Sequence, residues 1–198
     1  MVKLIYNNVE IERKDLAGVF IKYGSKKICI DTITDVNCDY LLYTHSHNNH
    51  APNVELLHNK YVISPFYGIR VQPGDAVKLD SNITVEVVNA YNITKVINGS
   101  VPHPKGFGVG YVINIDGKLL YHMGDTDLIE EMAALRNRKI NILFVPIGGS
   151  TVMTPEEAAD AVMLLRPIIS VPIHFTDRRD FAKFRDIAQP YTQVVLLQ

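Results

Sequence analysis

The sequence predicts an α/β protein in which helices pack outside sheets. The first observation is a series of apolar runs of strand length, separated by turn residues, over residues 19–122. The second is that residues 127–197 alternate between segments with helical spacing and apolar runs of strand length. Apolar strands with helices between them are typical of sheets whose faces are covered by helices.

The first half is expected to be rich in strands. The short turn Gly24-Ser25 predicts one hairpin, and the two-residue turn Asp116-Gly117 predicts another. Residues 83–91 alternate apolar and polar side chains, so one face of that strand is apolar. A short helix is expected at 52–59. The expected strands are 19–23, 27–31, 40–44, 61–64, 76–79, 83–91, 109–115 and 118–122.

The second half is expected to follow a β-α-β-α-β order after an initial helix. Helical spacing predicts the helix at 127–138. A helix from Thr154 to about Arg166 has several start signals, because Thr154 can cap it, Pro155 suits its first turn and Glu157 completes a capping box. The last helix is expected at 180–188, and strands are expected at 140–147, 168–173 and 193–197.

Composition indicates a single domain over residues 1–198. The net charge of -1 gives no case for a basic nucleic-acid-binding surface, so no nucleic-acid partner is expected. No signal peptide and no apolar run of about 20 residues is seen, so no membrane partner is expected. Cys29 and Cys38 form no CxxC pair and are interpreted as reduced thiols of a cytoplasmic protein. The sequence leaves the oligomeric state open.

Residues 44–50 (THSHNNH) carry three histidines directly after an apolar run. Imidazole is a common ligand of zinc, and a cluster after a strand places ligands on a loop held by a rigid edge. The alternative is a polar loop that is merely rich in His and Asn. There are three further candidates: Asp125 and His174 follow apolar runs in the same way, and His103 lies in the run 102–106 (PHPKG). Side chains at strand ends can converge from distant positions, so the set favours a metal site.

The order HxHxxH, a lone His, Gly-Asp-Thr and a final His after a strand resembles the metallo-β-lactamase superfamily over nearly the whole chain. Further stretches resemble its small bacterial and archaeal metal-dependent hydrolase branch, which is related to ascorbate-phosphate lactonase-like proteins. The resemblance implies a four-layer αββα sandwich. The stretches are 90–92 (AYN), 103–106 (HPKG), 110–113 (GYVI), 124–127 (GDTD), 154–159 (TPEEAA) and 172–174 (PIH).

The resemblance also implies a ligand set. His45, His47 and His103 would hold one metal, His50 and His174 a second, and Asp125 would bridge the two. One or two Zn²⁺ per chain are expected, with Mn²⁺ or Fe²⁺ as alternatives. A metal-bound hydroxide would then attack an ester, lactone, thioester or phosphoester of a small molecule. The sequence does not select among these substrates.

Asn49 departs from the family motif HxHxDH, in which an aspartate precedes the last histidine. A neutral amide is a weaker ligand and cannot act as a general base. One interpretation is a weaker second metal site; the other is that Asn49 binds metal through its carbonyl oxygen. Asn49, at the position of the motif aspartate, and Asp125, the carboxylate of the ligand set, are the catalytic candidates.

Tyr91 and Asn92 follow a predicted strand and are candidates for substrate binding, with a loop role as the alternative. Asp31 ends a strand, and is interpreted either as a partner of a ligand histidine or as a turn residue. His122 is expected to be a core or supporting histidine. Weaker candidates are His58, Lys95, residues 148–151 and Arg178-Arg179, all with surface or loop roles as alternatives.

Three other functions compete with a small-molecule hydrolase. A nuclease of the same superfamily, acting on RNA or DNA, is disfavoured by the neutral net charge. A di-iron oxygen or nitric oxide reductase is disfavoured because those relatives look to have a carboxylate where this chain has His47, and they carry a flavin domain that is not seen in this sequence. A non-catalytic metal-binding relative is supported by Asn49 alone.

Overall fold

The computed structural model describes residues 2–34 and 36–197, and they form two compact units. The first unit contains the described residues up to Gln72 together with Leu197, and the second contains Pro73–Leu196. The single domain expected from the sequence stays a prediction.

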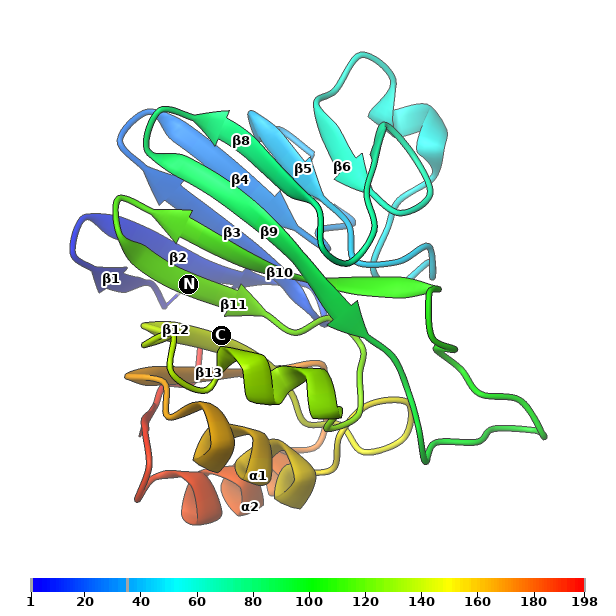
Figure 1. The fold of residues 1–198 in the computed structure, drawn as a ribbon, viewed down its shortest axis with the longest axis vertical. Helices are drawn as coiled ribbons and strands as arrows, with labels where there is room; N and C mark the ends of the chain where they lie inside the picture. The colour runs from blue at the N-terminus through cyan, green and yellow to red at the C-terminus, as the bar shows by residue number, and fades with distance from the viewer. Residues whose placement is uncertain (1, 35, 198) are drawn as a thin grey trace. The chain divides into compact units, whose positions relative to one another are not determined.

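The first unit is built around a seven-stranded sheet in which the strands lie in sequence order (Figure 1). Strands β1 to β4 pair antiparallel, and β4 to β7 pair parallel. A short 3-10 helix, η1 (Val54–Leu57), lies between β5 and β6. The strands are β1 (Leu4–Tyr6), β2 (Val9–Lys14), β3 (Gly18–Tyr23), β4 (Lys26–Ile30), β5 (Tyr40–Leu42), β6 (Val62–Ser64) and β7 (Ile69–Arg70).

Cys29 and Cys38 form a disulfide, with their Cα atoms 5.8 Å apart, so the prediction of reduced thiols was wrong. The pair meets because the chain after β4 turns back toward that strand before β5. Two hydrogen bonds hold this return: Lys27 N–H donates to Asp39 Oδ2 at 2.7 Å, and Asp39 N–H donates to the Lys27 carbonyl at 3.0 Å. Cytoplasmic location stays a prediction.

The second unit repeats the strand arrangement of the first. Strands β8 to β11 pair antiparallel, β11 to β14 pair parallel, and all lie in sequence order. Four antiparallel strands followed by three parallel additions therefore occur twice in the chain. The strands are β8 (Ala76–Asp80), β9 (Ile83–Ala90), β10 (Gly108–Ile115), β11 (Lys118–His122), β12 (Ile142–Pro146), β13 (Ile169–Ile173) and β14 (Gln193–Val194).

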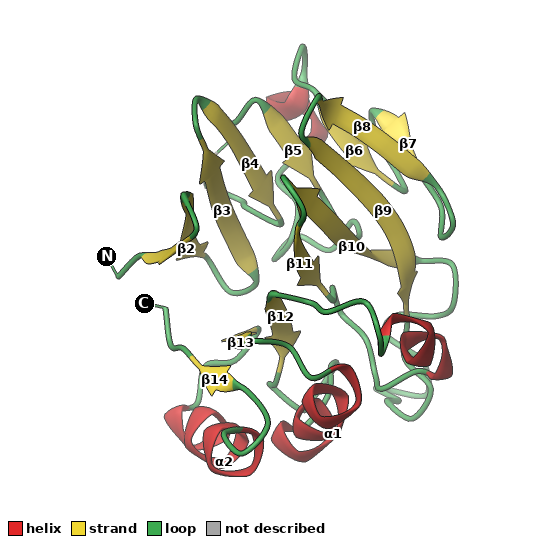
Figure 2. Cartoon of the chain, turned by 60° about the vertical axis from the view of Figure 1, so that its left-hand side comes forward, coloured by secondary structure: helices red, strands yellow, loops and turns green. Residues whose placement is uncertain are grey.

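Helices connect the parallel strands of the second unit. η2 (Glu130–Leu135) precedes β12, while α1 (Pro155–Leu165) and α2 (Arg178–Ala188) lie on one side of β12 and β13 (Figure 2). The capping box of α1 is confirmed: Thr154 Oγ1 accepts from Glu157 N–H at 3.2 Å, and Glu157 Oε2 accepts from Thr154 N–H at 2.7 Å. Apolar side chains of the three helices and the sheet share one core.

Two expected helices are short 3-10 segments instead. The segment 127–138 forms only η2, and 52–59 forms only η1, because spacing of three to four residues is common to both helix types in short stretches. Strands β1, β2 and β7 were not predicted, and β14 is shorter than expected. In the described part of the chain, no helix is long and apolar enough to cross a membrane.

Candidate metal centre

The histidines of the first unit gather on the loop after β5. His50 and Ala51 donate backbone N–H groups to the His47 carbonyl at 2.9 and 3.0 Å, which closes a turn over residues 48–50. This turn returns the His50 ring to within 4.1 Å of the His45 ring, between centroids, and the His47 ring lies 4.8 Å from His45. His45 and His50 are buried. The chain therefore turns at Asn48-Asn49.

Asp31, directly after β4, orients two of these histidines. Asp31 Oδ2 accepts from His50 Nδ1 at 2.8 Å and from the Thr44 hydroxyl at 2.6 Å. Because the Thr44 hydroxyl donates to Asp31, its oxygen is left to accept from His45 Nδ1, 3.0 Å away. Both rings thus carry their proton on Nδ1, so that Nε2 is the atom that could bind a metal. The hydrogen bond from Asp31 to a histidine matches one of the two interpretations from sequence.

The second unit brings its three candidates together at one carboxylate oxygen. His103 Nε2 lies 3.2 Å from Asp125 Oδ2, and His174 Nε2 lies 3.1 Å from the same atom. Asp125 follows β11, His174 follows β13, and His103 precedes β10. All three side chains are buried. Two imidazoles and a carboxylate that converge in this way can bind a divalent cation.

Asn92 fixes the tautomer of His103. Asn92 Oδ1 accepts from His103 Nδ1 at 2.8 Å and from its backbone N–H at 3.1 Å. The Thr151 carbonyl lies 3.2 Å from the same Nδ1. Because both neighbours of Nδ1 are acceptors, the proton resides there and Nε2 faces Asp125. The buried Asn92 amide also donates to Asp127 and Thr151, each at 3.0 Å, so its contacts support positioning of His103 rather than contact with substrate.

Asp127 anchors the segment that carries Asn92, a role that was not predicted from the sequence. Its Oδ2 accepts from the backbone N–H groups of Ile93 and Thr94 at 2.8 and 2.7 Å. Burial raises the pKa of Asp127, but these two donors, the Asn92 amide and the Lys95 ammonium outweigh burial and lower the pKa overall. The only sequence signal was its place in the run Gly-Asp-Thr-Asp.

His174 sits in an unusual backbone conformation, with φ 53°. The loop after β12 presses against it: a Cβ atom added to Gly148 would overlap the His174 carbonyl oxygen. A non-glycine residue with positive φ is strained and persists where its surroundings hold it. Residues 148–151 therefore support the histidines through their backbone, since Thr151 also contacts His103.

Tyr91 and Asn49 have surroundings that leave their predicted roles open. The Tyr91 hydroxyl donates to Glu131 at 3.0 Å, and Lys105 Nζ lies 4.9 Å from the centre of the Tyr91 ring. Asn49 is exposed in the turn before His50. Substrate binding by Tyr91 and a catalytic role for Asn49 stay predictions.

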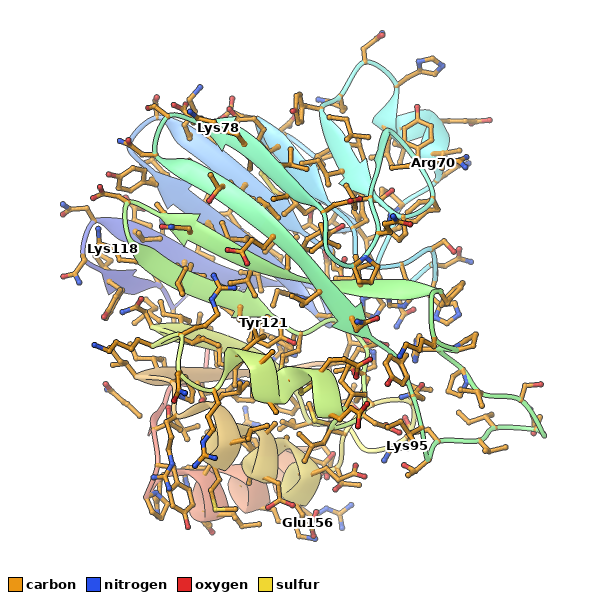
Figure 3. The ribbon with its side chains drawn as sticks, viewed as in Figure 1. Arg70, Lys78, Lys95, Lys118, Tyr121 and Glu156 are labelled. Carbon is orange, nitrogen blue, oxygen red and sulfur yellow. A yellow bond between two sulfur atoms is a disulfide. The ribbon has the colours of Figure 1, made fainter. Side chains whose placement is uncertain are left out.

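The weaker candidates occupy structural positions. His122 is buried and its Nδ1 accepts from Gly124 N–H at 3.2 Å, as expected for a core histidine. His58 is exposed. Lys95, on the loop that extends from the sheet after β9 (Figure 3), pairs with Glu157 at 2.6 Å.

The donor set fits a divalent transition metal. Its members are imidazole nitrogens and carboxylate oxygens, which suit zinc, iron and manganese. In the first unit, one ligand atom each from Asp31, His45 and His50 lies within 4.8 Å of the others. Asp125, His103 and His174 form the corresponding group in the second unit.

A pocket of ≈ 550 Å³ adjoins the histidine loop of the first unit. Ser46, Asn48 and Ala51 of that loop line it together with apolar residues such as Ile33 and Phe66. None of its lining residues carries an ionisable side chain. This surface therefore suits an uncharged chemical group.

Comparison with known proteins places these features in a family. The model of the β-lactamase superfamily domain matches residues 7–174. A UPF0173 metal-dependent hydrolase from Staphylococcus epidermidis is 30% identical over 89% of this chain and 86% of its own. A second from Thermococcus kodakarensis is 29% identical over 91% of this chain and 93% of its own.

Solved structures agree with these matches. The crystal structure of a candidate metal-dependent hydrolase from Parabacteroides distasonis is 26% identical, has a TM-score of 0.85, and covers 96% of this chain and 94% of that protein. Igni18, a metallo hydrolase from Ignicoccus hospitalis, is 22% identical with a TM-score of 0.77, and covers 96% of this chain and 95% of its own.

Proposed function

Because the chain belongs to the metallo-β-lactamase superfamily and to its branch of small metal-dependent hydrolases, we propose that it uses zinc to hydrolyse an ester, lactone, thioester or phosphoester of a small molecule. The family match and the structural neighbours also confirm the α/β fold class that the sequence predicts. Mn²⁺ and Fe²⁺ are the alternative metals.

The proposed ligands follow the motif order. His45, His47 and His103 hold one metal, His50 and His174 a second, and Asp125 contacts both. The observation that carries this assignment is the Nδ1 hydrogen bonding of His45, His50 and His103, which leaves Nε2 as the ligand atom in each ring. A bound zinc supplies Lewis acidity and lowers the pKa of a water ligand to about 7.

The protein's own carboxylates then divide the remaining work. Asp31 accepts hydrogen bonds from Thr44 and His50, and the bond from His50 makes that ring a stronger ligand. Asn49 is neutral and cannot take up a proton at ordinary pH. We therefore assign proton acceptance during hydrolysis to Asp125, the carboxylate that faces His103 and His174.

The pocket beside the histidine loop supports a substrate whose non-reacting group is uncharged. Its lining offers the hydroxyl of Ser46 and the amides of Asn48 and Asn53 among apolar side chains. Polar neutral groups of this kind orient a carbonyl or hydroxyl without attracting a counter-charge. Neutral esters and lactones fit this description better than phosphoesters.

Metal content and turnover test the proposal together. Protein purified without chelators should contain zinc by elemental analysis and hydrolyse members of an ester and lactone panel. His47→Ala should lose about tenfold or more in metal affinity and lose turnover, while His58→Ala, at an exposed histidine, should match the unmodified protein. Unchanged metal content in the His47 variant would overturn the ligand assignment. Cleavage of single-stranded RNA in preference to the panel would favour the nuclease alternative.

A further inference from the structure

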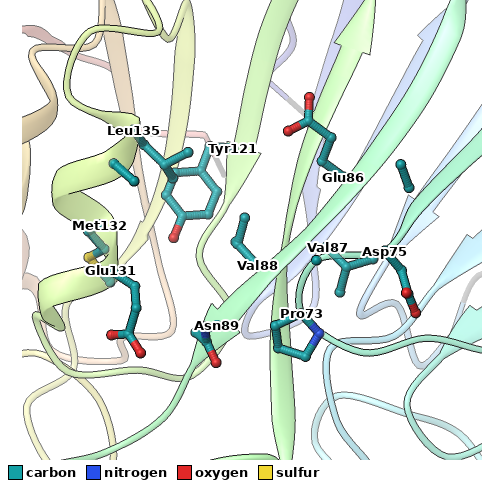
Figure 4. Close-up of a pocket in the computed structure, with 13 residues that line it drawn as sticks. Pro73, Asp75, Glu86, Val87, Val88, Asn89, Tyr121, Glu131, Met132 and Leu135 are labelled. Atoms are coloured by element: carbon teal, nitrogen blue, oxygen red, sulfur yellow. The ribbon is translucent and has the colours of Figure 1, made fainter.

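A second pocket, of ≈ 540 Å³, lies on the other unit of the chain (Figure 4). Residues 73–76 and 86–89, part of η2 and Tyr121 of β11 line it. None of His103, Asp125 and His174 belongs to its lining. The proposed hydrolysis therefore makes no use of this space.

The Tyr121 hydroxyl is the feature of this pocket that calls for a ligand. The Tyr121 side chain is fully buried, and among the described residues its hydroxyl has no hydrogen-bonding partner. The hydroxyl points between Met132 and Val88, into the pocket (Figure 4). Buried hydroxyls are nearly always hydrogen-bonded, because removing one from water without a partner is costly. A ligand oxygen would supply the missing acceptor.

The charges around the pocket define what it can accept. Its acidic lining residues are Asp75, Glu86 and Glu131, and its lining has no Lys, Arg or His. Glu86 is paired with Arg138 at 2.7 Å, and Glu131 with Lys105 at 2.8 Å. An anion would meet three carboxylates, and a cation would compete with Arg138 for Glu86 and with Lys105 for Glu131. The remaining surface includes apolar side chains of η2 and β9.

We propose that this pocket binds a small neutral molecule with an apolar body and a carbonyl oxygen that accepts a hydrogen bond from Tyr121. Its volume lies within the range of about 300–1,000 Å³ that is common for small-molecule sites. This binding activity is separate from the proposed hydrolysis and does not depend on it.

Three probes of similar size and shape test the proposal in titrations followed by ligand NMR. Acetophenone has the carbonyl, ethylbenzene lacks it, and benzoate adds a negative charge. The unmodified protein should bind acetophenone more tightly than either of the others. Tyr121→Phe should weaken acetophenone by about fivefold, the effect of one hydrogen bond, and leave ethylbenzene unchanged. Val88→Phe, which fills the pocket and keeps the hydroxyl, should remove binding of both.

Thermal unfolding separates a ligand role from a structural one. Because the Tyr121 hydroxyl has no protein partner, Tyr121→Phe should unfold at the same temperature as the unmodified protein or higher. A lower unfolding temperature would show a structural hydrogen bond and overturn the proposal. So would equal acetophenone affinity in both forms, tighter binding of benzoate, or the lack of acetophenone binding to the unmodified protein.

Discussion

Asn92 holds His103 at two atoms through one carboxamide oxygen, which lies 2.8 Å from the ring Nδ1 and 3.1 Å from the backbone nitrogen. The nitrogen of the same carboxamide donates to Asp127 and Thr151. If the amide were flipped, its NH2 group would face the two N–H donors of His103, and its oxygen would face the acceptor oxygens of Asp127 and Thr151. The tautomer of His103 therefore depends on Asn92, which makes no described contact with Asp125.

Asn92→Ala should lower metal affinity by about 10–100-fold, because loss of a partner that orients a ligand histidine has this effect in metal sites. Zinc titration of the metal-free protein measures it. Asn82→Ala removes an exposed amide from the same unit and is the matched control. Equal affinity in Asn92→Ala and Asn82→Ala would show that His103 is held without the amide.

Gly148→Ala should displace His174, because the new Cβ overlaps the His174 carbonyl oxygen. We expect a loss of about 1–3 kcal/mol in the free energy of unfolding and weaker metal binding. Urea denaturation and zinc titration measure the two effects. Ser150→Ala, at an exposed residue of the same loop, should change neither. A fully stable Gly148→Ala protein with normal zinc binding would contradict the role given to this loop.

Asn49→Asp should tighten zinc binding by about tenfold or more, since this needs only about 1.4 kcal/mol and a carboxylate adds a full charge near the ion. Asn48→Asp adds the same charge to the adjacent exposed residue and is the control. Calorimetric titration of both variants distinguishes ligation from general attraction. If neither differs from the unmodified protein, Asn49 itself serves as a ligand through its carbonyl oxygen.

Asp127→Asn should destabilise the metal-free protein at pH 7 and less at acid pH. The folded pKa of Asp127 is lowered, so its stabilisation is present above the unfolded pKa of about 3.9 and is lost as pH falls through the folded value. The urea midpoints of the unmodified protein and of Asp127→Asn should therefore differ at pH 7 and lie closer together at pH 3. Asp160→Asn, at an exposed position, provides the comparison. A constant difference at both pH values would exclude the ionised carboxylate as the cause.

Reduction of the Cys29–Cys38 disulfide should lower the free energy of unfolding by about 2–3 kcal/mol, the value expected for a bridge across a short loop. Thermal unfolding with and without dithiothreitol measures this loss. The double variant Cys29→Ser, Cys38→Ser should unfold at the temperature of the reduced protein and should not respond to dithiothreitol. Identical curves in both conditions would mean that the bridge adds no stability.

The sequence predicted features that depend on local chemistry. The capping residues of α1 and the hairpin turn at Asp116-Gly117 act over a few positions, and both occur in the structure. Strand ends were predicted within one or two residues where apolar runs were long, as for β9 and β10.

Contacts between residues that lie apart in the sequence could not be predicted. Nothing in the spacing predicts that Asn92 forms hydrogen bonds with His103 and Asp127, since these partners lie 11 and 35 residues away. The disulfide was missed for the same reason: two cysteines separated by 9 residues pair only because β4 and the chain before β5 meet. Short edge strands such as β1 and β7 carry too few apolar residues to give a periodic signal.

The order of strands in each sheet has a consequence for how the chain folds. Within each sheet, every strand after the first pairs with the strand before it in sequence, so no pairing must wait for a distant segment to arrive. Closing short loops costs less entropy than closing long ones, and proteins with local pairing fold faster. Each sheet can therefore grow one strand at a time from its first hairpin, and could begin to do so during synthesis on the ribosome. We expect hydrogen-exchange protection to appear in β2–β4 and β9–β11 before it appears in the parallel strands.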